Sequence, residues 1–128
     1  MKYLIDTHIV LWLLDDELAI PATTLLQLKD PENELFVSIA SIWEIAIKRS
    51  LGKLTISRPT QAIADELPAT GISILPILTS HVVQTEALPF HHRDPFDRII
   101  IAQALVEGCV VVSKDGNFPL YSVPLLWY

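Results

Sequence analysis

Residues 94–112, DPFDRIIIAQALVEGCVVV, decide the fold because they join a well-marked helix directly to a buried strand. Asp94 is a good helix N-cap and Pro95 suits the first helical position, so a helix is expected to begin here. Gly108 ends the helix, because glycine readily takes the left-handed conformation found there. Residues 109–112 are continuously apolar, as strands are when helices cover both faces of a sheet. The stretch therefore indicates an α/β fold.

The rest of the chain alternates between the same two patterns, short apolar runs and longer helical periodicity. The expected strands are 3–5, 35–38, 72–77 and 109–112, with 123–126 as a candidate last strand. The expected helices are 9–14, 21–29, 41–51, 59–67, 80–87 and 94–108. Strands that alternate with helices form a parallel sheet between helical layers. We therefore predict a three-layer α/β/α sandwich with a central, mostly parallel sheet.

Composition limits the class of protein. The chain has 128 residues, of which 51% are hydrophobic, so residues 1–128 are expected to form a single domain. Its one cysteine, Cys109, cannot form an internal disulfide, and the apolar content excludes a disordered chain. Acidic residues outnumber basic ones by 15 to 9, for a net charge of −6. This balance weighs against nucleic-acid binding through a broad basic surface.

The sequence contains no stretch expected to enter or cross a membrane. The first apolar run is interrupted by Asp6, and the next ends at Asp15. A signal peptide needs about 7–15 uninterrupted apolar residues and a membrane helix needs about 20. We therefore expect a cytoplasmic protein with no membrane partner.

Four carboxylates lie where the expected strands and helices meet at one edge of the sheet. Asp6 directly follows the first strand, and Glu44 is expected in the first turn of the helix after the second strand. Asp97 is in the first turn of the helix that begins at Asp94, and Asp115 follows the fourth strand. Ligands of parallel sheets bind beyond the carboxyl ends of the strands. These side chains are therefore expected to share one pocket.

Each acid also has a purely structural interpretation. Asp6 is suited to cap the helix that follows it, and Asp115 opens a common Asp-Gly turn. Ser41 and Glu44 match a capping box, and Glu44 and Lys48 are spaced for a favourable pair one helical turn apart. Caps and turns do not, however, explain why four acids should share one pocket. Carboxylates about 4 Å apart repel by on the order of 4 kcal/mol per pair at an effective dielectric near 20, a cost that a cation offsets.

A pocket lined by carboxylates favours a hard divalent cation, Mg²⁺ or Mn²⁺, over zinc. Such a cation lowers the pKa of a bound water and neutralises charge on phosphate oxygens, which is the chemistry of phosphodiester hydrolysis. Trp12 and Trp43 have apolar neighbours and are expected in the core, with base stacking as the other interpretation. Basic residues near the acids are candidates for phosphate contacts, or else solvate helix faces: Lys48, Arg49, Lys53, Arg98 and Lys114.

Four motifs resemble those of PIN domains and, more narrowly, of VapC-type toxins of bacterial toxin–antitoxin pairs. They are LIDTH at 4–8, SIWEI at 41–45, DPFDRIIIAQA at 94–104 and VSKD at 112–115, in the family's order. The resemblance implies a PIN-like fold and a Mg²⁺- or Mn²⁺-dependent endoribonuclease that leaves 5′-phosphate and 3′-hydroxyl ends. It also implies a homodimer, inhibition by a cognate VapB-type antitoxin, and contact with DNA only indirectly, through the antitoxin complex.

The resemblance also assigns individual residues. The catalytic and metal-binding acids would be Asp6, Glu44, Asp97 and Asp115. Thr7 corresponds to the small hydroxyl residue that often follows the first acid, and Asp94 to the helix N-cap, with a supporting role beside the metal as an option. Ser113 departs from the threonine that is common at its position, but the hydroxyl group is kept.

Other classes of function are alternatives to a nuclease. A catalytically inactive PIN-like module would bind RNA or protein without cutting it, but the complete acidic set argues against this. A haloacid-dehalogenase-like phosphatase would have Asp-x-Asp after the first strand, where this chain has His8 in the second position. A response-regulator receiver would have an aspartate after the strand expected at 72–77, and none follows. Whichever function applies, abundant apolar residues, such as Leu11, indicate a surface that contacts a partner protein.

Overall fold

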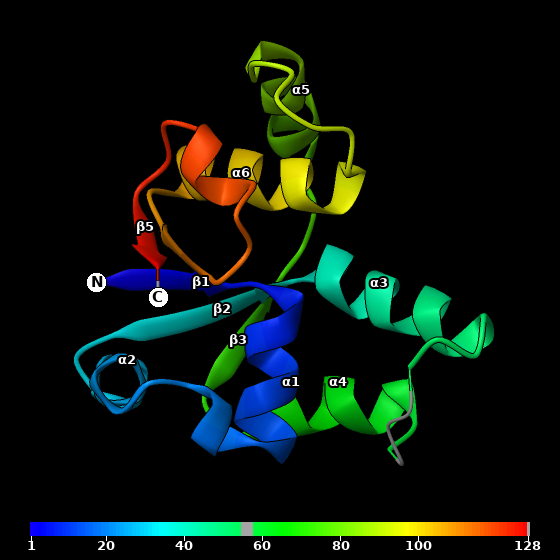
Figure 1. Ribbon diagram of the computed structural model, residues 1–128, viewed down its shortest axis with the longest axis vertical. Helices are drawn as coiled ribbons and strands as arrows, with labels where there is room; N and C mark the ends of the chain where they lie inside the picture. The colour runs from blue at the N-terminus through cyan, green and yellow to red at the C-terminus, as the bar shows by residue number, and fades with distance from the viewer. Residues whose placement is uncertain (55–57, 128) are drawn as a thin grey trace.

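A sheet of five parallel strands lies at the centre of the computed structural model, which describes residues 1–54 and 58–127 (Figure 1). The strands are β1 (Lys2–Ile5), β2 (Glu34–Ser38), β3 (Ile72–Leu75), β4 (Val110–Ser113) and β5 (Leu125–Trp127). Their order is β3-β2-β1-β4-β5, and every neighbouring pair is parallel. The predicted parallel sheet is confirmed, including a last strand that begins two residues later than expected.

Helices cover both faces of this sheet, as Figure 1 shows, with α5 and α6 on one side and α1, α2 and α4 on the other. The helices are α1 (Thr7–Asp15), α2 (Ala22–Lys29), α3 (Ile39–Ser50), α4 (Thr60–Ala69), α5 (Thr79–Ala87) and α6 (Pro95–Glu107). The arrangement is the predicted three-layer α/β/α sandwich. Within the described residues, no helix is long and apolar enough to cross a membrane.

Alternate strand residues fill two separate cores, one on each side of the sheet. Leu4 and Val111 pack with α6, whereas their neighbours Ile5, Val37 and Val112 pack with α1, α3 and α4. All five side chains are fully buried. Because both faces are covered, both sets of side chains are apolar, which explains the continuous apolar runs in the sequence.

Side-chain caps mark the starts of α3 and α6, and α1 and α3 each begin two residues earlier than predicted. The Asp94 carboxylate accepts the Phe96 backbone N–H at 2.9 Å and starts α6 as expected. Helix α3, however, begins at Ile39, where the Ser38 hydroxyl accepts from the Ala40 backbone N–H. The predicted capping box of Ser41 and Glu44 is therefore wrong, because Ser38 caps the helix earlier. Glu44 lies in the second turn of α3, not the first.

The two tryptophans expected in the core have different environments. Trp12 is half-buried and packs against the core on the α1 side of the sheet. Trp43 is 60% exposed on α3, where its ring meets Phe96 edge-on with ring centres 5.2 Å apart. The core prediction is therefore wrong for Trp43. Its neighbours Ile42 and Ile45 on α3 are buried, so apolar neighbours in the sequence do not by themselves indicate that Trp43 is buried.

Candidate active site

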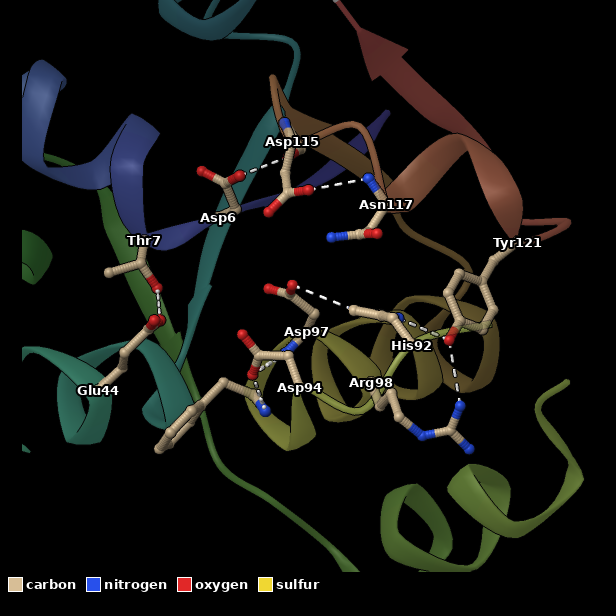
Figure 2. Close-up of polar contacts among 12 residues, drawn as sticks. Asp6, Thr7, Glu44, His92, Asp94, Asp97, Arg98, Asp115, Asn117 and Tyr121 are labelled. Carbon is tan, nitrogen blue, oxygen red and sulfur yellow. Dashed lines mark hydrogen bonds and ion pairs between the residues drawn. The ribbon is translucent and has the colours of Figure 1, made fainter. Parts of the chain in front are cut away.

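The strand order reverses at β1, since β2 and β3 lie on one side of it and β4 and β5 on the other. Such a reversal opens a crevice beyond the carboxyl ends of the two adjoining strands. Asp6 directly follows β1 and Asp115 lies two residues after β4. A hollow of about 120 Å³ is found here, lined by Asp6, Thr7, His8, Glu44, Lys48, Asp94, Asp97 and Asp115. All four predicted acids therefore surround one space, as Figure 2 shows.

Asp6 is held through both of its carboxylate oxygens. Oδ1 accepts the Ile9 backbone N–H at 3.0 Å and so caps α1, while Oδ2 accepts the Ser113 hydroxyl. The Ser113 oxygen in turn accepts the Asp115 backbone N–H at 3.0 Å. Ser113 thus joins the ends of β1 and β4 and fixes two acids relative to each other. The capping role of Asp6 is compatible with its place in the hollow.

Glu44 reaches the hollow from α3 and is held by two side chains. Its Oε1 accepts the Thr7 hydroxyl at 2.7 Å, and its Oε2 lies 3.2 Å from Lys48 Nζ. The expected Glu44–Lys48 pair is therefore present. Thr7 is buried at the start of α1, so it links the first and second acidic segments. Lys48 places one positive charge at the edge of the carboxylates.

Asp97 is held by a histidine whose contacts no sequence spacing indicated. His92 Nε2 lies 3.2 Å from Asp97 Oδ2, and His92 Nδ1 lies 2.8 Å from the Tyr121 hydroxyl (Figure 2). Arg98 Nη1 donates to the same hydroxyl at 3.1 Å. The one available signal is that His92 lies five residues before Asp97, in the segment that leads into α6. Nothing in the sequence links His92 or Asp97 to Tyr121.

Asn117 is a second residue that the sequence did not mark. Its backbone N–H donates to Asp115 Oδ1 at 2.8 Å, which closes the turn after β4. In Figure 2 its side-chain amide extends toward the space between Asp115 and Asp97. An Asp-Gly turn is common, but only the folded turn shows that the residue after the glycine faces the acids.

The predicted basic residues separate into two groups. The Arg98 guanidinium donates to two backbone carbonyls, of Pro89 and Thr85, and lies 4.6 Å from the centre of the Phe90 ring. It therefore braces the segment before α6, and this geometry does not support the expected phosphate contact. Lys48 lines the acidic hollow and Lys114 lines an adjoining cleft. The lining of these two spaces does not include Arg49 or Lys53.

Burial and mutual repulsion raise the pKa of two acids in the hollow. The pKa of Asp97 is raised to about 8, first by burial and then by the negative charges of Asp94, Asp115, Glu44 and Asp6. The pKa of Asp6 is also raised, because its burial outweighs the hydrogen bonds from Ser113 and Ile9 that lower it. Desolvation and like charges both disfavour the ionised form, so this is a place where a positive ion is favoured.

The donor set of the hollow fits a hard divalent cation. Five carboxylates and one lysine line it, so oxygen ligands and negative charge are both in excess. These five are among the 15 acids of the chain, so the net charge of −6 partly reflects the hollow itself. Across residues 1–54 and 58–127, however, no three His, Cys, Asp or Glu side chains are arranged to hold a metal ion as they stand. Glu44 is turned to Lys48 and Thr7, and Asp97 to His92.

The fold and the hollow together define an α/β/α protein with an acidic hollow at the point where the strand order reverses. The sequence identifies the family within this class. The sequence model of the PIN domain matches residues 3–123, and the chain therefore belongs to the PIN domain family. The family resemblance predicted from the four motifs is confirmed. A sequence search of curated proteins gave no match.

Solved structures with the same fold include toxin–antitoxin complexes. One is VapBC2 from Rickettsia felis bound to a DNA fragment from their promoter (TM-score 0.75, 16% identity, covering 100% of this chain and 99% of that chain). Another is DNA-bound VapBC from Salmonella typhimurium (TM-score 0.68, 15% identity, 99% and 98% covered). A third is a toxin–antitoxin complex from Klebsiella pneumoniae (TM-score 0.65, 20% identity, 97% and 95% covered). At these identities the likeness shows a shared fold.

Proposed function

We propose that the protein is a VapC-type toxin, a metal-dependent endoribonuclease that hydrolyses RNA phosphodiester bonds. The observation that carries the proposal is the convergence of five carboxylates on one hollow at the carboxyl ends of β1 and β4. The raised pKa of Asp97 supports it, because a pocket so crowded with negative charge is stabilised by a bound cation. Membership of the PIN domain family supports the same activity.

In this proposal Mg²⁺ or Mn²⁺, when bound, acidifies a water molecule and offsets negative charge on the phosphate. Asp6, Glu44, Asp97 and Asp115 would hold the cation. Ser113 fixes the first and last of these acids, Thr7 orients Glu44, and His92 orients Asp97. Asp94 keeps α6 in register by capping it, so that Asp97 faces the other acids.

Lys48 has a separate role from the acids. It is the lysine in the lining of the hollow, and its ammonium group is held beside the carboxylates by Glu44. A phosphodiester that enters the hollow brings a negative charge that needs a positive partner. Lys48 would donate to a non-bridging phosphate oxygen there, and a lysine suits this as a compact point charge.

The proposal includes partners. A VapB-type antitoxin would inhibit the enzyme, and the protein would contact DNA only through that complex. The support is the shared fold with structures that are named as VapBC and toxin–antitoxin complexes. A homodimer and a cytoplasmic location belong to the same proposal. Exposed apolar side chains on α5 and α6, Val82, Val83 and Val106 among them, supply surface for such contacts.

The experiment is an RNA cleavage assay with the purified chain, in Mg²⁺, in Mn²⁺ and in EDTA. Cleavage should require the cation and leave 5′-phosphate ends. Asp97→Asn should lower the rate by about 100-fold or more, which equals about 2.7 kcal/mol of transition-state stabilisation. Asp65→Asn is the matched control, since Asp65 is exposed on α4 and pairs with Gln61. RNA binding without cation-dependent cleavage would favour the alternative, a catalytically inactive PIN-like RNA- or protein-binding module.

A further inference from the structure

The acidic hollow continues into a second, larger cleft. This cleft has a volume of about 280 Å³ and is lined by Asp6, His8, Trp12, Lys114 and Asp115. It shares Asp6, His8 and Asp115 with the acidic hollow, so the two spaces form one crevice at the carboxyl ends of β1 and β4. One half of the crevice is lined by carboxylates. The other half, which we call the aromatic cleft, adds Trp12 and Lys114.

The residues of the aromatic cleft come from two elements that face each other. His8 and Trp12 are four residues apart on α1, so they share one face of that helix, and their ring centres are 6.3 Å apart. Lys114 comes from the segment after β4, and its Nζ lies 5.6 Å from the centre of the Trp12 ring. Trp12 is half-buried and therefore held in place, whereas Lys114 is exposed.

This set of groups matches one nucleotide. The indole of Trp12 offers a flat surface on which any nucleobase stacks, and the Lys114 ammonium offers a positive charge for a phosphate. The base is the uncharged part of a nucleotide, so it meets no repulsion from Asp6 and Asp115. The volume of about 280 Å³ lies just below the usual 300–1,000 Å³ of small-molecule pockets, which suits one base rather than a larger ligand.

We propose that the aromatic cleft binds the nucleobase next to the scissile phosphodiester, with Trp12 as the stacking surface and Lys114 as the contact for the adjoining phosphate. The inference rests on the proposed nuclease function, because the acidic hollow must hold the scissile phosphate for its neighbour to reach Trp12. It adds a base-binding site to that function. An antitoxin side chain is the competing occupant, and the test below separates the two.

The test begins with binding of a fluorescein-labelled single-stranded RNA to Asp97→Asn protein, measured by anisotropy. Trp12→Ala should raise the Kd about tenfold, the size expected for the loss of one base–aromatic stack. Trp12→Phe should recover most of the affinity, because it keeps a ring. Lys114→Ala should raise the Kd. The slope of log Kd against log salt concentration should also fall by about one, as expected for the loss of one phosphate contact. Trp43→Ala is the matched control and should leave the Kd unchanged, since Trp43 is exposed on α3 and lines neither space.

An abasic scan gives a second measurement that does not depend on the folding of the Trp12 variants. Removal of single bases from the RNA should weaken binding most at one position, beside the cleavage site mapped with the wild-type protein. That penalty should disappear in Trp12→Ala, which has no ring to stack on, and largely persist in Trp12→Phe, which keeps one. An equal penalty at every position, or a Trp12→Ala variant that binds RNA as the wild type does, would overturn the proposal and leave the cleft to a protein partner. Absence of cleavage by the wild type would instead overturn the nuclease function itself.

Discussion

His92 stands beside Asp97 with its Nε2 3.2 Å from the Asp97 Oδ2, and it is the contact that directs this carboxylate. The other ring nitrogen, Nδ1, lies 2.8 Å from the Tyr121 hydroxyl. With Asp97 ionised, Nε2–H donates to the carboxylate and Nδ1 accepts the Tyr121 O–H. The hydroxyl oxygen then accepts from Arg98 Nη1. Asp97 is therefore anchored through a chain of hydrogen bonds that ends outside the acidic hollow.

The first prediction concerns His92 as a positioning residue. His92→Ala should lower the affinity for Mn²⁺ by about 10- to 100-fold, the usual cost of losing a group that orients a metal-binding side chain. His92→Gln keeps a donor and should recover part of that affinity. The measurements are Mn²⁺ titration by calorimetry and RNA cleavage at saturating and limiting Mn²⁺.

His91→Ala is the control for this prediction. His91 is exposed and meets the same Tyr121 ring edge-on, with ring centres 4.9 Å apart, but within the described residues it makes no hydrogen bond or ion pair with a carboxylate. The His91→Ala variant should therefore bind Mn²⁺ with unchanged affinity. Equal losses in both variants would mean that the segment before α6 is merely destabilised, and would count against the positioning role.

Particular residues show how far sequence alone predicts this site. Asp97 was predictable because Asp94 and Pro95 mark the start of its helix, and capping is a local property. Glu44 was placed one turn too early, because Ser38 and Ser41 both suit an N-cap and only tertiary packing selects Ser38. The contact of His92 with Tyr121 spans 29 residues, and no periodicity encodes it. Local signals thus place Asp97 on its helix, whereas the position of Glu44 within α3 and the groups that orient the acids depend on the fold.

The second prediction is a pH dependence of stability in EDTA. The pKa of Asp97 rises from an ordinary 3.8 to about 8 in the folded chain, so the folded state keeps a proton that the unfolded state loses. The stabilising effect of this proton is complete below pH 3.8 and is lost as the pH rises to about 8. Asp97→Asn cannot ionise, so its Tm should exceed that of the wild type increasingly from pH 4 to pH 8. A change of about 1 kcal/mol corresponds to roughly 3–6 °C here.

Thermal unfolding in EDTA across pH 4 to 9 checks this prediction, with the difference between variant and wild type as the quantity followed. Asp65→Asn, at an exposed position on α4, should show no such trend. A Tm difference that is flat with pH would show that burial and the neighbouring carboxylates do not raise the pKa of Asp97 in the folded protein. Addition of Mn²⁺ at pH 8 should stabilise the wild type more than Asp97→Asn.

The third prediction separates the two contacts of Lys48. Loss of the ammonium group removes one of the two side-chain partners of Glu44 and, in the proposed function, a contact to phosphate. Lys48→Ala should therefore raise KM for RNA by about 10-fold or more, since a hydrogen bond to a charged group contributes about 1.5–3 kcal/mol. Lys29→Ala is the control, because Lys29 pairs with Glu17 on the surface and is absent from the hollow's lining. Steady-state cleavage kinetics give both constants, and an unchanged KM would remove Lys48 from the substrate site.

The fourth prediction concerns Ser113, which donates to Asp6 and accepts from the Asp115 backbone N–H. Ser113 is fully buried, so Ser113→Ala leaves both groups without a replacement from water. The two acids would lose their fixed separation, and the Mn²⁺ concentration for half-maximal cleavage should rise about 10-fold, with a Tm lower by several degrees. Ser73→Ala, on the exposed side of β3, is the matched control and should change neither. If Ser113→Ala lowered the Tm but left the Mn²⁺ requirement unchanged, Ser113 would join the strands without positioning the acids.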